Sequence, residues 1–452
     1  MICNAKRNIA GKNCNAGMKS ARKNRTGNRN EIRAAATGAD DKEVSVRIAM
    51  DALCVLFSKA FDIIEAEQLG ASEHHSMRVA ALCALMGKRQ GFDNDAIAAL
   101  TTCALFHDNA LTEYLLSTKK GEQQAMHFRL HCEYGERNVA WLPFTTNIDG
   151  FVLYHHENES GKGLFEKREG EFPAEAALIA AADVIDAGHH LQQIAERDLG
   201  ALRDIIAGSI GKVSTRSAME ALLDVLDAET LASLRDEAIY ETLERLIPPW
   251  KVASEDVSVI RLARFIAHIV DCKSHFTCKH TEQIANRAWL VSGQYGYSDA
   301  ERAQLYLAAA LHDIGKIATP LGVLEKPGKL TDEEFTVIQG HIRHTYDWLS
   351  VIEGLGKIWH WAAEHHEKLD GSGYPRGLRA EDLDRNSRLM ACIDIYQAVC
   401  EERPYHAARS HQDTMPILYD MADKGKIDAG IVKDMDEIMA PYSLRDLPPP
   451  PV

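Results

Sequence analysis

The sequence is poor in the features that mark membrane, secreted or disulfide-bonded proteins. Its 452 residues contain no apolar run close to the roughly 18 residues that a membrane-spanning helix needs, and its start, MICNAKRNIAGKNC, lacks the apolar core of a signal peptide. The ten cysteines form no CxxC pair and no framework spacing, which is typical of reduced thiols. We therefore expect a cytoplasmic protein.

Strand patterns and an excess of positive charge are also missing. Alternating β-branched runs are few, whereas long stretches of Ala, Leu, Ile, Glu and Arg dominate, so the sequence predicts an all-α fold. The formal net charge of −15 disfavours nonspecific binding to a nucleic acid polymer. The length favours two or three domains, each able to bury a core of its own.

Composition divides the chain into five parts. The first 40 residues carry nine Lys and Arg against Glu31 and Asp40, which predicts a disordered tail; an arm for an anionic partner and a start placed too early are the alternatives. The last residues, LPPPPV, predict a Pro-rich tail with no core to join. The expected boundaries are 1–40 for the basic tail, 41–190 for a first helical domain, 191–254 for a helical connector, 255–440 for a second helical domain and 441–452 for the Pro-rich tail.

A long-range repeat relates the two helical domains. Histidine and aspartate landmarks recur in the same order, separated by 32, 29, 24 and 29 residues in the second half and by 32, 24, 24 and 28 in the first, and they include ten of the twenty histidines. The second set is His280, His312-Asp313, His341, His365-His366 and Asp394; the first set is His75, His107-Asp108, His131, His155-His156 and Asp183. The recurrence predicts duplication of one helical domain.

The landmark residue types point to metal chemistry. Imidazole and carboxylate groups that project inward from several helices of a bundle can converge on metal ions. The set contains no cysteine, which argues against a structural zinc and favours ions such as Fe, Mn, Zn, Co or Ni. Two such ions a few ångströms apart suit the hydrolysis of a phosphoester. Any single histidine here is more simply a hydrogen-bonded core residue, so the inference depends on the joint pattern.

Three motifs of the second half, HDIGK (312–316), HHEKLDGSGYP (365–375) and DIYQAVCEERPY (394–405), resemble the HD-GYP family of HD-domain phosphohydrolases. The resemblance covers about residues 260–420. It implies a helical bundle with a two- or three-metal centre, in a bacterial second-messenger enzyme. Such an enzyme hydrolyses a cyclic dinucleotide, chiefly cyclic di-GMP to pGpG or GMP, and in some members 3′,3′-cyclic GMP-AMP.

Carried over by position, the resemblance implies a set of metal ligands and two catalytic residues. The ligands are His280, His312, Asp313, His341, His365, His366 and Asp394. Asp313 would bridge two ions whose shared hydroxide attacks phosphorus, and Lys316 would stabilise the developing charge. The position of the glutamate that a third ion uses is Phe276 here, so two divalent ions are expected, Fe or Mn first and Ni, Co or Zn as alternatives. Gln397 replaces a second aspartate common in the family, a departure expected to affect substrate geometry.

The same resemblance implies a substrate-binding loop. Gly371, Gly373, Tyr374 and Pro375 would form it, with Tyr374 against a guanine face or a protein partner, or only packing. Arg403 is expected either to contact a phosphate or to be a solvated helix-end arginine.

The first half keeps the ligand types His75, His107, Asp108, His131, His155, His156 and Asp183 as a second metal set. Leu111 stands in place of Lys316, and GKGLF replaces GSGYP. The first domain is therefore interpreted as a degenerate regulatory or dimerising HD domain, with a second phosphohydrolase and a ligand-sensing module as alternatives.

The implied partners are the cyclic dinucleotide, a diguanylate cyclase of the GGDEF type and a second copy of the chain. The alternative function is a non-catalytic signalling protein that binds the nucleotide or a partner through the GYP loop; hydrolysis of a smaller phosphoester is a third.

Overall fold

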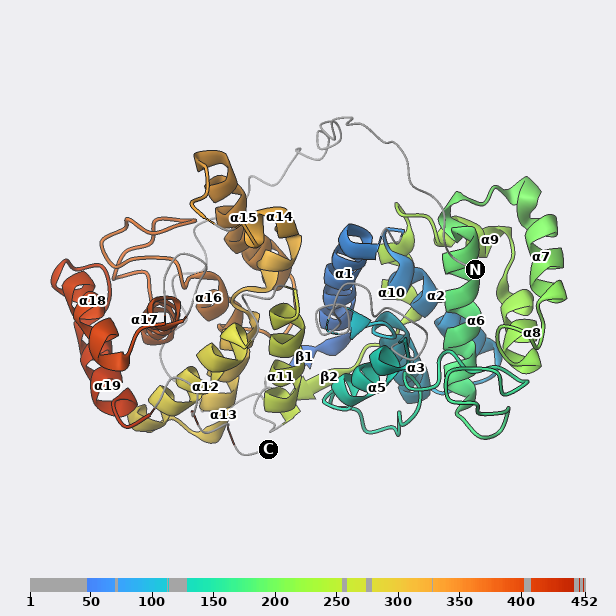
Figure 1. Cartoon of the computed structure of the whole chain (residues 1–452), viewed down its shortest axis with the longest axis horizontal. Helices are drawn as coiled ribbons and strands as arrows, with labels where there is room; N and C mark the ends of the chain where they lie inside the picture. Colours follow the sequence, from blue (N-terminus) through green and yellow to red (C-terminus); the bar gives the residue numbers. More distant parts are fainter. Residues whose placement is uncertain are drawn as a thin grey trace, which may run out of the picture. The chain divides into compact units, whose positions relative to one another are not determined.

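Helices make up nearly all the regular structure of the chain (Figure 1), which confirms the predicted all-α fold class. The computed structural model describes residues 47–69, 72–111, 113, 128–253, 258–273, 279–326, 328–401, 408–442, 447 and 450. Within these ranges the strands are β1 (Arg47–Ala49) and β2 (Lys251–Ala253), which pair antiparallel with Ile48 opposite Val252. The helical periodicity of the sequence did not predict this strand pair, because three residues are too few to show a period of two.

The first copy of the repeat is built from α1 (Met50–Leu69), α2 (His75–Arg89), α3 (Asn94–Leu105), α5 (Phe128–Val139) and α6 (Ala174–His189). Asp93 begins α3 by accepting the N–H of Ala96 at 2.9 Å, which satisfies one of the amides that the first helical turn leaves unpaired. Many side chains of α2, α3 and α6 are buried alanines, so α2 packs closely against both of the others.

The connector joins the core of the first copy. It contains η1 (Leu191–Gln193), η2 (Glu196–Asp198), α7 (Leu199–Gly208), α8 (Arg216–Val225), α9 (Ala228–Ser233) and α10 (Ile239–Leu246). Both α8 and α10 pack against α2, and the side chains of Leu222 and Leu243 are fully buried. Thr215 and Asp227 cap α8 and α9. The connector thus packs directly against α2.

The second copy is longer than the first. It contains α11 (Ser258–Asp271), α12 (His280–Ser292), η3 (Gly293–Tyr295), α13 (Asp299–Leu311), η4 (Ile314–Ala318), α14 (Leu321–Leu324), α15 (Asp332–Leu349), α16 (Ile358–Ala363), α17 (Arg385–Cys400), α18 (His411–Asp423) and α19 (Ala429–Met439). Capping boxes begin α13 and α15, where Ser298 pairs with Glu301 and Thr331 with Glu334. α18 and α19 form a hairpin that packs against α17 (Figure 1).

The repeat extends one helix further upstream than the landmarks indicated. Asp62 of α1 accepts the N–H of Ser76 at 3.1 Å, and Asp271 of α11 accepts the N–H of Thr281 at 2.9 Å. Each buried carboxylate thus caps the helix that begins with the first landmark histidine. The N-terminus of α2 and that of α12 are held in the same way.

The two predicted tails lie wholly or mostly outside the described residues. The 1–40 tail lies outside the described residues. Of the 441–452 tail, Leu447 is buried and the carbonyl of Pro450 accepts a hydrogen bond from Arg264 of α11 at 3.1 Å, while most of its other residues lie outside the described ones. Among the described helices, none combines the length and apolar character that crossing a bilayer requires.

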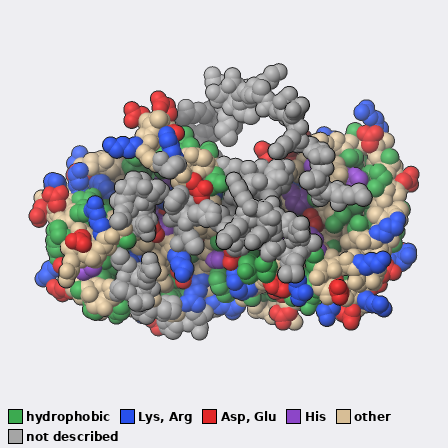
Figure 2. Space-filling view, in the orientation of Figure 1, with side chains coloured by type: hydrophobic (Ala, Val, Ile, Leu, Met, Phe, Trp, Pro, Cys, Tyr) green, Lys and Arg blue, Asp and Glu red, His purple; other side chains and the backbone are tan. Residues whose placement is uncertain are grey.

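Acidic and basic side chains are interspersed over the described surface of the face in Figure 2.

The partly buried carboxylate of Glu113 connects the copies: His268 of α11 donates to it at 2.8 Å, and Arg137 donates to it at 2.9 Å. Burial raises the pKa of Glu113, but these hydrogen bonds outweigh it and lower the pKa to about 2.

We expect Glu113→Gln to lower the free energy of unfolding by about 1 kcal/mol at pH 7. Because the folded-state pKa of Glu113 is depressed, its contribution is present above the usual value of 4.5 and is lost as the pH falls toward about 2. Urea midpoints of the two proteins should therefore converge below pH 4.5. Glu353→Gln, in the exposed pair with Lys251, is the control. A difference that is constant across this pH range would contradict the role given to the carboxylate.

Candidate metal centre

Five separate segments bring the second set of landmarks together. His280 begins α12, His312 and Asp313 lie between α13 and η4, and His341 lies in α15. His365 and His366 follow α16, and Asp394 lies in α17. All of them except His366 are buried, and His366 is only partly exposed. The structure thus places the whole predicted set in one interior site.

Six of the seven residues form two groups of three, and Asp313 is the seventh. Ligand atoms of His280, His312 and Asp394 lie within 4.8 Å of one another, and so do those of His341, His365 and His366. Buried histidines and a carboxylate at such spacing are a donor set for divalent ions.

Asp313 lies between the two groups. Its Oδ2 is 3.1 Å from Nε2 of His312 and 3.6 Å from Nε2 of His280. Its Oδ1 is 3.3 Å from Nε2 of His341 and 3.9 Å from Nε2 of His365. One carboxylate therefore presents one oxygen to each group.

Backbone carbonyls set the orientation of three imidazoles. Nδ1 of His312 donates to the carbonyl of Ala309 at 2.6 Å, and Nδ1 of His365 donates to that of Ala362 at 2.6 Å. His341 does the same with Ile338 at 2.5 Å. Since a carbonyl can only accept, the proton of each neutral ring is on Nδ1, and Nε2 presents its lone pair to the interior. This is the arrangement that metal-binding histidines adopt.

The fit of a metal ion is supported by atoms that form no hydrogen bond although they are buried. They are Nε2 of His280, His312, His341 and His365, together with Oδ1 of Asp313. Buried polar atoms of this kind destabilise a fold by about 1–3 kcal/mol each unless a partner is supplied. The residues present therefore fit divalent cations.

Burial also favours the neutral, metal-binding form of His365 and His366. It lowers the pKa of His366 to about 3 and that of His365 well below its usual range. Burial also lowers the pKa of His280, but the nearby carboxylates of Asp313 and Glu401 outweigh it and raise the pKa to about 9. His280 thus faces a carboxylate at each of its ring nitrogens.

Glu401 is a supporting residue that the sequence analysis missed. Its Oε2 lies 2.8 Å from Nδ1 of His280, and its Oε1 accepts from Gln397 at 3.3 Å. In the first copy the same task falls to Asp186, 2.7 Å from Nδ1 of His75 and three residues after Asp183. Glu401 follows Asp394 by seven residues, two helical turns, and this spacing was the available signal. Gln397 is thus linked to His280 by way of the Glu401 carboxylate.

Lys316 reaches the site from η4. Its ammonium group donates to Oδ2 of Asp313. At the corresponding place in the first copy, Leu111 is buried and apolar. Among the residues that the structure describes, a lysine contacts the shared carboxylate in the second copy and none does so in the first.

The loop after the histidine pair is held by Glu367. Its carboxylate accepts the N–H groups of Arg376 and Leu378 at 2.8 and 2.9 Å. Gly371 has φ 80°, and a Cβ at Gly373 would lie 2.4 Å from the backbone of Glu367, so both positions require glycine.

The other predicted loop residues lie at the rim of the site. The ring of Tyr374 is 4.9 Å from that of His366, with Pro375 next to it and exposed. Arg403 and Phe276 lie outside the described residues.

The first copy has nearly the same loop, which the replacement of GSGYP by GKGLF did not indicate. Glu157 accepts the N–H groups of Phe165 and Lys167 at 2.7 and 2.6 Å, eight and ten residues later. In the second copy these distances along the chain are nine and eleven residues, so its loop has one extra residue beside Tyr374 and Pro375. The glutamate of HHE is therefore a loop-holding residue in both copies.

The first set of landmarks also converges. Asp108 Oδ1 is 3.5 Å from Nε2 of both His131 and His155, and Asp108 Oδ2 is 3.5 Å from Nε2 of His107. His75, His107 and Asp183 form one group, and His131, His155 and His156 form a second that includes Cys132. Nε2 of His107 and of His155 are buried without a hydrogen bond. The first copy can therefore hold a cation as well.

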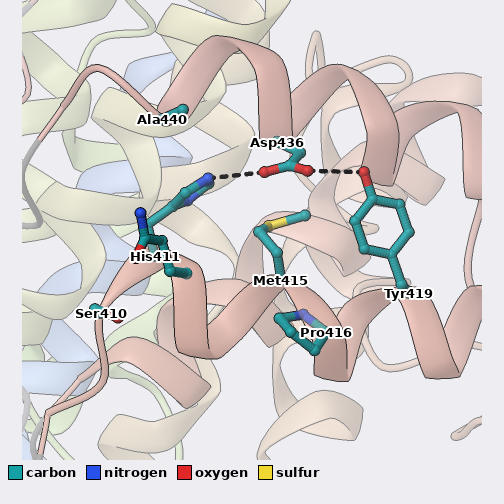
Figure 3. A pocket seen from close by; sticks show the side chains of 8 residues that line it. Ser410, His411, Met415, Pro416, Tyr419, Asp436 and Ala440 are labelled. Atoms are coloured by element: carbon teal, nitrogen blue, oxygen red, sulfur yellow. Dashed lines mark hydrogen bonds and ion pairs between the residues drawn. The ribbon is translucent and has the colours of Figure 1, made fainter.

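A pocket of 570 Å³ lies between α18 and α19 (Figure 3). Within it, Asp436 accepts hydrogen bonds from His411 at 3.0 Å and Tyr419 at 2.9 Å. None of the lining residues belongs to either metal set. The pocket is thus distinct from the candidate metal centre.

Comparison with known proteins gives consistent matches. Residues 73–188 and 264–431 each match the model of the HD domain. The chain is 30% identical over 315 residues to 3′3′-cGAMP-specific phosphodiesterase 1 of Vibrio cholerae, covering 67% of this chain and 72% of the relative. It is 30% identical over 322 residues to 3′3′-cGAMP-specific phosphodiesterase 3 of Vibrio cholerae, covering 69% of this chain and 68% of the relative.

A solved structure of a cyclic GMP-AMP specific phosphodiesterase from V. cholerae superposes with a TM-score of 0.58 at 20% identity. The superposition covers 88% of this chain and 99% of that one, which shows a shared fold.

Gly315 allows α15 to approach the metal centre. A Cβ at this position would lie 1.9 Å from the carbonyl oxygen of His341, so we expect Gly315→Ala to displace α15. The expected result is a loss of about 1–3 kcal/mol in unfolding free energy and fewer metal ions bound per chain, measured by thermal unfolding and metal analysis. Gly322→Ala is the matched control, since no atom lies within 4 Å of its added Cβ. Equal behaviour of the two variants would refute the close-approach argument.

Proposed function

Because this chain belongs to the HD-domain phosphodiesterases and carries an HD-GYP domain behind a second HD domain, we propose that its second copy hydrolyses a cyclic dinucleotide in a metal-dependent reaction. The observation that carries the proposal is the position of Asp313, whose two oxygens face two separate histidine groups. A site for one metal ion would not need a carboxylate placed between two histidine groups.

The proposed ligands are the residues of the two groups together with Asp313. His280, His312 and Asp394 would hold one ion, and His341, His365 and His366 the other. Nitrogen and carboxylate donors without thiolate suit Fe or Mn. When bound, such ions supply Lewis-acid charge for the phosphoryl group and lower the pKa of water.

The protein's own contribution is charge, orientation and enclosure. Lys316, at hydrogen-bond distance from Asp313, is placed to stabilise negative charge that develops on the phosphoryl oxygens. The ring of Tyr374 lies against that of His366 at the rim, where it would limit access from the loop side. Glu401 holds His280 through Nδ1.

The relatives that align with two thirds of the chain are named for 3′3′-cGAMP, and this favours 3′,3′-cyclic GMP-AMP over cyclic di-GMP as the first substrate to test. Shorter alignments reach relatives named cyclic di-GMP phosphodiesterases, so both substrates are needed in the assay.

We further propose that the first copy binds metal without hydrolysing the dinucleotide. Its histidine groups are complete, but Leu111 cannot stabilise phosphoryl charge. Contacts of α2 with α8 and α10 give the first copy a route to the connector, which suits a regulatory role.

Turnover is tested with purified protein, Mn²⁺ or Fe²⁺ and reducing agent, with chromatography of the products from both cyclic dinucleotides. We expect Asp313→Ala to abolish the linear product because the carboxylate between the two groups is lost. Asp108→Ala, the matched change in the first copy, should retain turnover. The proposal fails if the wild-type protein gives no product from either substrate, and a purely nucleotide-binding protein would then be indicated by binding without turnover. Equal loss in folded Asp108→Ala would instead overturn the assignment of activity to the second copy.

Lys316→Ala should lower kcat by about 10²–10³-fold, the usual effect of removing one group that stabilises transition-state charge, while the metal content stays unchanged. Lys326→Ala is the control, because Lys326 pairs with Glu334 outside the centre. Loss of metal from Lys316→Ala would show that the lysine organises the ligands and has no separate effect on the reaction.

A further inference from the structure

Beside the metal centre of the second copy lies a group of side chains with no task in metal binding. Tyr346 of α15 and Trp359 of α16 meet edge to face with ring centroids 5.0 Å apart, and the ring of His360 stacks on Trp359 at 3.6 Å. The guanidinium of Arg376 lies 5.9 Å above the centroid of Tyr346. We call Tyr346, Trp359, His360 and Arg376 the aromatic shelf.

The shelf is fixed to the histidine pair from both sides. The N–H of Arg376 donates to Glu367, the residue after His366. Its guanidinium lies 3.9 Å from Glu364, the residue before His365, and Glu364 in turn lies 3.0 Å from Nδ1 of His360. Arg376 therefore cannot move far from the rim of the metal centre, although its side chain is 46% exposed.

The first copy has none of these side chains at the corresponding places, and this separates the shelf from metal binding. Glu136 takes the place of Tyr346, five residues after the landmark histidine of its helix, and accepts backbone N–H groups of Val152 and Leu153. Asp149 and Gly150 take the places of Trp359 and His360. Phe165 takes the hydrogen-bonding position of Arg376. Because the aromatic shelf is present in the second copy alone, we relate it to substrate recognition.

Resting on the proposed function, we propose that the aromatic shelf is the base-recognition subsite of the second copy and that it selects guanine. An aromatic ring beside a guanidinium, as Tyr346 beside Arg376, offers a face on which a purine can stack. Arginine presents only donors, and its fork matches the O6 and N7 acceptors of guanine, whereas adenine presents a donor at N6. The phosphodiester itself is served by the metal set and Lys316, which leaves Arg376 for the base.

Arg376→Ala and Arg376→Lys test this assignment, with Arg343→Ala as the control because Arg343 is an 83% exposed arginine of α15 that pairs with Asp347. We expect Arg376→Ala to raise KM for cyclic di-GMP and 3′,3′-cyclic GMP-AMP by about tenfold or more, as for the loss of a bidentate arginine–guanine pair. Arg376→Lys, which keeps the charge and loses the fork, should not restore KM. Cyclic di-AMP kinetics and hydrolysis of the base-free bis(p-nitrophenyl) phosphate should be unchanged.

Two results would overturn the inference. One is an unchanged KM for the guanine-containing substrates; the other is an equal rise for cyclic di-AMP, which would make Arg376 a phosphate contact. Calorimetric binding of pGpG and pApA gives the same comparison without turnover, and a preference for pGpG that survives in Arg376→Ala would also refute it. Failure of the wild-type protein to hydrolyse any diester, with normal selective binding of pGpG, would count against the proposed function and leave the subsite supported.

Discussion

The buried carboxylate of Asp313 is the interaction on which the rest of the second copy depends. Four imidazole Nε2 atoms face its two oxygens, and neither these four nitrogens nor Oδ1 of Asp313 has a hydrogen bond. Such an arrangement destabilises a bare helical bundle, so the surrounding structure must hold it in place. Carbonyls one turn back orient three of the rings, Glu401 holds His280, and Gly315 lets α15 come close enough for His341 to reach the site. The binding of cations, for which this donor set is suited, offsets that cost.

Comparison of the two copies separates the scaffold from the chemistry. Both have the landmark histidines, the capping aspartate on the preceding helix and a glutamate that gathers the following loop. They differ at the rim, where the second copy has Lys316 and Arg376 and the first has Leu111 and Phe165. In the proposed function, metal binding and action on a nucleotide are carried by different residues, so a mutation can remove one while the other stays.

Much of the site could be predicted because its residue types are unusual and their order is repeated. The landmark pattern led to the groups that the structure brings together, and the alanine- and leucine-rich stretches led to the helical fold class. Glu401 and Glu367 were missed because an isolated glutamate carries no signal of its partner, and both act through hydrogen bonds to groups on other segments or loops. The similarity of the two loops was also missed, since GKGLF and GSGYP differ in side chains while their backbones make the same hydrogen bonds to Glu157 and Glu367.

The sequence by itself determined the donor types, their order and the helices that carry them, because residue chemistry and helical periodicity are local properties of the chain. It also determined that only one copy has a lysine next to the shared aspartate. Only the tertiary structure decided which oxygen of Asp313 faces which imidazole group, which carboxylate supports His280, and that Arg376 lies over Tyr346 beside the histidine pair. These relations join side chains from α12, α15 and the segments that follow α13, α16 and α17, and they arise from packing between segments far apart in the chain.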